Sequence, residues 1–100
     1  MASPHQVPNM LKTNQTVSDA QLVDAVHYAI RLTEFRITLP RIQLVKPNKQ
    51  HRMLEEGCLV LDAAERRGGL QRMLEPNTLG RLRALLEMMQ VQLQSRGVAV

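Results

Sequence analysis

Four side chains that can bind metals or transfer protons lie along one predicted helix. His51, Glu55, Cys58 and Asp62 are spaced i, i+4, i+7 and i+11, which places them within a narrow arc of that helix. Sets of histidine, cysteine and carboxylate ligands can hold zinc. A straight helix, however, presents only two adjacent turns to one ion, so other elements would have to supply the remaining ligands. A solvated polar edge explains the pattern more simply, and we expect neither a metal site nor a cofactor.

Asp24 and His27 form a second pair of side chains that could take part in catalysis. They are three residues apart, so on a helix the carboxylate could orient the imidazole for general-base catalysis. Such a base needs a nucleophile, and no serine or cysteine can be placed beside it. No glycine-rich loop indicates a phosphate site either. We therefore predict that the chain has no catalytic residues and is not an enzyme.

The stretch 69–83 resembles a helix-turn-helix, with a short helix, a tight polar turn and a helix that carries basic residues. The resemblance implies a DNA-binding transcriptional regulator as the alternative function. The residues that would contact DNA are Asn77, Thr78, Arg81 and Arg83. The stretch departs from the motif at Arg72, where an apolar residue is expected, and at Met73, where the turn usually has glycine.

Capping and stop signals divide most of the chain into helices. Ser18 is a good N-cap, and Gln21 completes the pattern of a capping box. Asn48 is the N-cap candidate for a second helix, which Gly68 and Gly69 would end. The predicted helices are 18–38, 49–67, a short one at 70–74, and a last one from about 77 to 97.

These elements predict an all-α fold, a small bundle of three main helices plus one short helix, in a helical domain at 18–97. Residues 1–17 contain two prolines, many polar side chains and almost no apolar periodicity, so we predict a flexible N-terminal arm there. Residues 98–100 form a tail. The segment 39–47 is ambiguous. We favour a kinked helix end that leads into a connector, and a short edge strand near 41–45 is the alternative.

The first long helix has two apolar faces. The broader face consists of Leu22, Val23, Val26, Ala29, Ile30, Thr33 and Ile37. The second consists of Tyr28, Leu32, Phe35 and Leu39. Because a surface helix of a small monomer needs only one buried face, the second is available for a partner. Leaving its four residues in water would forgo about 1.5–3 kcal/mol for each.

The last helix has one strong and one thin apolar stripe. Its strong stripe alternates spacings of three and four, which is typical of close helix packing, and consists of Leu79, Leu82, Leu86, Met89 and Leu93. Met88 and Val91 lie on the opposite side. The predicted protein interface is therefore Tyr28, Leu32, Phe35, Leu39, Met88 and Val91. These surfaces favour a small regulatory or adaptor protein of the inhibitor, anti-activator or chaperone type, and we predict that it is a homodimer.

The basic residues gather in one part of the chain, although the net charge is only +4. These basic residues would form a rim around the interface and speed encounter with an acidic partner. They are Arg31, Arg36, Arg41, Lys46, Lys49 and Arg52. The single cysteine, Cys58, excludes an intrachain disulfide and fits a reducing compartment, so we expect a cytoplasmic protein. No apolar run approaches the length of about 20 residues that a membrane-spanning helix needs.

Overall fold

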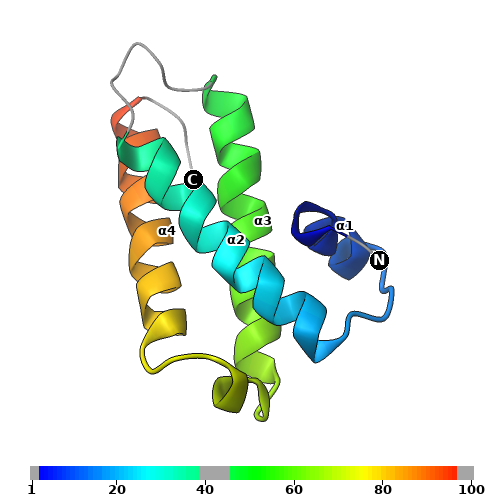
Figure 1. Ribbon diagram of the computed structural model, residues 1–100. Helices are drawn as coiled ribbons and strands as arrows, with labels where there is room; N and C mark the ends of the chain where they lie inside the picture. The colour runs from blue at the N-terminus through cyan, green and yellow to red at the C-terminus, as the bar shows by residue number, and fades with distance from the viewer. Residues whose placement is uncertain (1–2, 39–45, 97–100) are drawn as a thin grey trace.

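The structure, a computed structural model, describes residues 3–38 and 46–96, and these residues form helices and connecting turns only (Figure 1). In chain order the elements are η1 (Pro4–Gln6), α1 (Val7–Lys12), α2 (Asp19–Thr38), α3 (Pro47–Arg66), η3 (Leu70–Met73) and α4 (Thr78–Ser95). The helices α2, α3 and α4 pack pairwise against one another, and α1 packs mainly on α3. The predicted all-α fold with three main helices is confirmed. The alternative strand at 41–45 lies outside the described residues.

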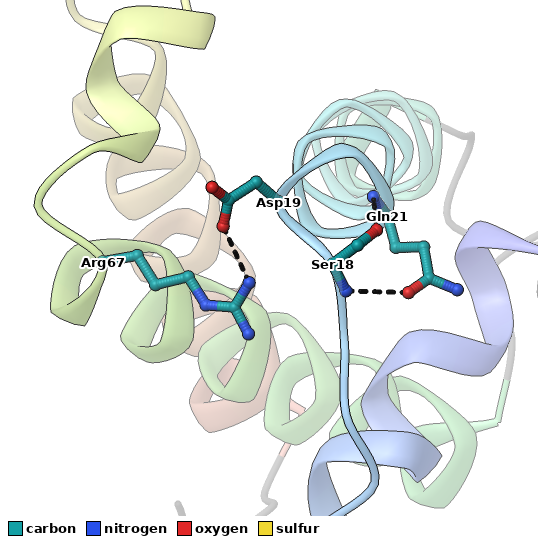
Figure 2. A network of polar contacts seen from close by, with 4 residues as sticks. All are labelled: Ser18, Asp19, Gln21 and Arg67. Carbon is teal, nitrogen blue, oxygen red and sulfur yellow. Dashed lines mark hydrogen bonds and ion pairs between the residues drawn. The ribbon is translucent and has the colours of Figure 1, made fainter.

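The start of α2 follows the predicted capping signal (Figure 2). The backbone N–H of Ser18 donates to Oε1 of Gln21 at 2.8 Å, and the backbone N–H of Gln21 donates to Oγ of Ser18 at 3.1 Å. This reciprocal pair satisfies two donors that a helix start otherwise leaves unpaired. Next to it, Nη1 of Arg67 lies 2.9 Å from Oδ1 of Asp19, which ties the start of α2 to the end of α3.

The boundaries of α3 differ slightly from the prediction. The helix begins at Pro47 with Lys46 as its N-cap, so the predicted N-cap Asn48 already lies inside it. Proline suits the first helical position because the N–H that it lacks would have no partner there. The helix ends at Arg66, just before the two glycines. Neither glycine adopts a left-handed conformation, so they do not end the helix in the way we expected.

The core lies where α2, α3 and α4 meet. Four of the five residues of the strong stripe of α4 are buried as predicted: Leu82, Leu86, Met89 and Leu93 are at most 4% exposed. The fifth, Leu79, is partly buried against the core. Opposite this stripe, Gly57 of α3 allows a close approach, since a Cβ atom there would lie 2.6 Å from Cδ2 of Leu86. The apolar packing thus follows the sequence pattern along both helices.

The predicted flexible arm is wrong for residues 4–12, which form η1 and α1 against the bundle. Val7 is fully buried, and Met10 and Leu11 pack partly buried against the core. These three residues follow the i, i+3, i+4 spacing of a single apolar face. Prolines obscured this short pattern, yet Pro8 lies in the first turn of α1, where a missing N–H costs little.

A buried polar cluster joins the three long helices at the end of the bundle where α3 begins. Gln50 is fully buried, and its Nε2 donates to Oε1 of Gln92 at 3.2 Å. Nε2 of Gln92 donates in turn to the backbone oxygen of Ile37 at 3.1 Å. Nη1 of Arg96 donates to Oε1 of Gln50 at 2.6 Å. These bonds fix the last turn of α2 relative to α3 and α4.

Candidate functional site

The second apolar face of α2 borders a slot between α2, α3 and η1, which we call the α2–α3 slot. Tyr28 and Leu32 are half-buried and line it from α2, and Met53 lines it from α3. Its volume is about 100 Å³. Phe35 lies one turn beyond Leu32 on the same face and is 57% exposed. Leu39, the last residue predicted for this face, lies outside the described residues.

The N-terminal segment closes one end of the slot. The ring of His5 lies 6.5 Å from that of Tyr28 at an angle of 52°, which is an ordinary contact between tilted rings. Glu56 also lines the slot, and its Oε2 lies 3.9 Å from Nζ of Lys12. The sequence does not reveal this slot, because its pattern predicts an arm at residues 4–12, which in the structure supply Pro4, His5 and Pro8 to the wall.

Two cations lie one turn beyond the slot, towards the end of the bundle where α3 begins. Arg36 follows Leu32 by four residues on α2, and Lys49 precedes Met53 by four residues on α3, so each shares a helix face with a slot residue. The Arg36 guanidinium lies 5.6 Å from the centroid of the Phe35 ring. Its Nε is buried and has no hydrogen-bond acceptor among residues 3–38 and 46–96.

The rest of the predicted basic rim is spread more widely. Lys46, the N-cap of α3, and Arg52 in its second turn are exposed, whereas Arg31 is exposed nearer the middle of α2. Within the described part of the chain, the ion pairs do not include any of these three residues. Arg41 lies outside that part. The cations near the start of α3 therefore form one electropositive end of the bundle.

Met88 and Val91 do not join the slot. They are 54% and 64% exposed and lie on the side of α4 opposite its buried stripe, with the exposed Ala84 one turn before Met88. We call these three residues the α4 stripe. The predicted interface therefore comprises two surfaces, the slot with Phe35 and the α4 stripe. Met73 on η3, which the prediction did not include, is also 50% exposed.

The basic residues predicted to contact DNA are bound to carboxylates of the chain itself. Nη2 of Arg81 lies 2.6 Å from Oε2 of Glu34 on α2. Arg83 forms an ion pair with Glu65 on α3. Both side chains are more than half exposed, so these pairs contribute little to stability. They nevertheless place a negative charge beside each guanidinium that would face DNA.

The turn before α4 also differs from the expected motif. The element that precedes it, η3, is a 3-10 helix of four residues, whereas the motif has a full first helix. Asn77 caps α4 in the left-handed region, with φ 67°. The hydroxyl of Thr78 donates to the backbone oxygen of Glu75 at 2.7 Å, so it is engaged within the turn.

The candidate metal and catalytic residues remain spread along their helices. Nδ1 of His51 lies 3.0 Å from Oε1 of Glu55, one turn away. Across the described ranges, no group of three or more histidine, cysteine, aspartate or glutamate side chains is placed to hold an ion. Within these same ranges, no hydrogen bond joins Asp24 to His27, so the carboxylate does not orient the imidazole.

The environment of Cys58 disfavours the thiolate, which is the reactive form of its side chain. Partial burial raises its pKa, and the nearby Asp62 carboxylate raises it further. The residue as a whole is exposed, so the shift arises from atoms that shield the sulfur locally. As pH rises, the unfolded chain therefore loses the thiol proton before the folded chain does. The contribution of Cys58 to stability is complete below the thiol pKa of the unfolded chain, and it is lost as pH rises through the thiol pKa of the folded chain.

We expect iodoacetamide to alkylate Cys58 with a pH midpoint that is higher in the folded chain than in the urea-unfolded chain. The thiolate is the nucleophile, and the shielding atoms and the Asp62 charge both disfavour it. Asp62→Asn should lower the folded midpoint, because it removes the neighbouring negative charge. Alkylation rates between pH 7 and 11 measure this. A folded midpoint at or below the unfolded one would contradict the assignment.

In comparisons with known proteins, the chain matches no protein-family model, no curated protein and no solved structure. Within residues 3–38 and 46–96, every helix is too short or too polar to cross a lipid bilayer. The two surfaces described above are therefore the features of the molecule that bear on its function.

Proposed function

We propose that the chain is a small regulatory or adaptor protein that binds another protein through the α2–α3 slot and Phe35. The observation that carries this proposal is the 57% exposure of Phe35 beside a slot lined mainly by apolar residues. Apolar surface of this kind on a small protein commonly marks an interface. An inhibitor, an anti-activator or a dedicated chaperone, working in the cytoplasm, would use such a surface without any chemistry of its own.

Aromatic side chains in such positions contribute strongly to association. They are enriched among the few interface residues that contribute most of the binding free energy, and truncating one commonly costs about 2 kcal/mol or more. Phe35 is fixed on the regular helix α2, near the polar cluster around Gln50, so little ordering is needed on binding. An exposed aromatic ring on a regular helix, next to a recess, is the kind of feature that a partner protein can recognise.

Replacing Phe35 with aspartate should remove partner binding and leave the fold intact. The tagged full-length chain, retrieved from extracts of its own cells, should enrich one or more proteins that Phe35→Asp retains at least about 30-fold less, as expected for a loss of about 2 kcal/mol. Quantitative mass spectrometry measures the ratio. The free energy of unfolding should change by less than about 1 kcal/mol, since the replaced side chain is mostly in water.

Met73→Asp is the matched control, because it places the same charge on an exposed apolar residue of η3. This element follows the end of α3, at the opposite end of the bundle from the start of α3 (Figure 1). The control should retain the captured proteins. If Phe35→Asp and Met73→Asp retain them equally well, the surface around Phe35 is not the interface.

We also propose that the α4 stripe forms a homodimer. The three residues of the stripe carry no charge, so the centre of a twofold contact there would be apolar. Its few apolar residues indicate a weak dimer, since stable interfaces bury about 1,200–2,000 Å². Sedimentation velocity across a concentration series should show a monomer–dimer equilibrium that Met88→Asp shifts to monomer. A wild-type chain that remains monomeric at millimolar concentration would exclude this dimer.

DNA binding is less well supported, because Arg81 and Arg83 already face carboxylates of the chain. A DNA-binding protein would hold duplex DNA at low salt and release it steeply as salt rises. Under the protein-binding proposal, filter binding at low salt should give the same weak retention for the wild type and for the double variant with both arginines changed to alanine.

A further inference from the structure

We infer that the α2–α3 slot receives one apolar side chain from an acidic segment of a different protein, whose carboxylates are bound by Arg36 and Lys49. This inference rests on the proposed function and specifies the chemistry of the partner. It follows from two features of the described residues: the size of the slot and the two cations beside it.

The size of the slot fits a single side chain. Its volume of about 100 Å³ is well below the roughly 300–1,000 Å³ of pockets that hold cofactors and other small molecules. An apolar cavity of about 150 Å³ holds benzene. The slot therefore has room for one leucine or methionine side chain, packed among Tyr28, Leu32 and Met53.

The cations beside the slot indicate the charge of the segment that carries this anchor. Arg36 and Lys49 lie one turn from the slot residues of their own helices, and neither forms an ion pair within residues 3–38 and 46–96. The buried Nε of Arg36 is a donor without an acceptor there. Carboxylates bind guanidinium groups with strong, charge-assisted hydrogen bonds. The one acid that lines the slot, Glu56, already faces Lys12.

The same charges argue against a second copy of this chain as the occupant. A twofold dimer brings the same surface of both copies together, so Arg36 and Lys49 would face a surface that carries the same two cations. Like charges in an interface oppose binding. A nucleic acid could also contact the two cations, but the recess beside them is lined mainly by apolar residues and holds only about 100 Å³. An acidic protein segment with an aliphatic anchor satisfies both the recess and the cations.

The test is a selection from a phage-displayed library of random 12-residue peptides against the immobilised full-length chain. We expect the enriched peptides to carry a leucine or methionine flanked by at least two aspartates or glutamates. The affinity of the strongest peptide is then measured by fluorescence anisotropy. It should fall at least tenfold with the double variant Arg36→Gln and Lys49→Gln, and also with Leu32→Glu.

The matched control is the double variant Arg66→Gln and Arg72→Gln, which removes two exposed cations at the other end of the bundle. It should leave the affinity within twofold of the wild type. Peptides that are neutral or basic, an affinity that does not depend on Arg36 and Lys49, or no enrichment at all would overturn the inference. Tighter binding of a 20-nucleotide RNA or DNA strand than of any selected peptide would also overturn it.

The failure of this inference can be told apart from that of the proposed function. If Phe35→Asp loses the captured proteins while the selected peptides are not acidic, the surface binds a protein and only the partner chemistry is wrong. If Phe35→Asp retains those proteins as well as the Met73→Asp control does, the proposed function itself fails.

Discussion

Leu82→Ala is expected to lower the free energy of unfolding by about 2–5 kcal/mol, the usual cost of a cavity left by a buried leucine. Leu82 is fully buried in the middle of the stripe that packs α4 on the bundle. The total stability of a small domain is about 5–15 kcal/mol, so this loss is a large share of it. Urea unfolding followed by circular dichroism measures the change.

Val91→Ala is the control for this substitution. Val91 lies on the same helix but is 64% exposed, so we expect its truncation to change the free energy of unfolding by less than about 0.5 kcal/mol. Equal losses for Leu82→Ala and Val91→Ala would mean that α4 does not pack with the face that the structure shows.

Val7→Asp is expected to release η1 and α1 from the bundle. Val7 is fully buried, and burying a valine contributes about 1.5–3 kcal/mol. An unpaired carboxylate cannot take its place at low cost, so the segment should leave its position while the three long helices stay folded. The free energy of unfolding should fall by at least the contribution of the valine.

Hydrogen exchange distinguishes local release from global unfolding. In Val7→Asp, the amides of α1 should lose protection while those of α4 keep theirs. Asn9→Asp places the same charge on an exposed position of α1 and should leave both sets protected. Unchanged protection of α1 in Val7→Asp would show that the segment is not held by this contact.

The sequence was most informative where a local pattern decides the structure. The capping box of Ser18 and Gln21 depends on two residues three apart, and it starts α2 as predicted. The buried stripe of α4 depends on a spacing that extends over four turns, and Leu82, Leu86 and Met89 lie in the core as expected. Patterns of this length are strong enough to identify the buried side of a helix.

The N-terminal segment escaped prediction because its signal is short. Only Val7, Met10 and Leu11 repeat at helical spacing, and two prolines lie within the same segment. An isolated helix of six residues is not stable in water. It forms here because α2 and α3 provide a surface against which Val7 is buried.

The candidate site was predicted only in part, because local patterns reveal one helix face but not the contacts between helices. The second face of α2 was visible as a repeat, and Phe35 is exposed on it. The slot beside Tyr28 and Leu32 is built with residues from α3 and η1, which no local pattern brings together. Likewise, the contact of Arg81 with Glu34 joins residues far apart in the chain, so its effect on the DNA-binding alternative could only come from the structure.

Site-specific crosslinking from position 35 tests most directly whether this surface binds a partner. The photoreactive residue p-benzoylphenylalanine replaces Phe35 in the full-length chain, which is irradiated inside its own cells, and the same residue at Met73 is the reference. We predict a discrete crosslinked product of higher mass from position 35 that contains a second, different protein, and no such product from position 73. No product from position 35, or the same products from both positions, would contradict the account.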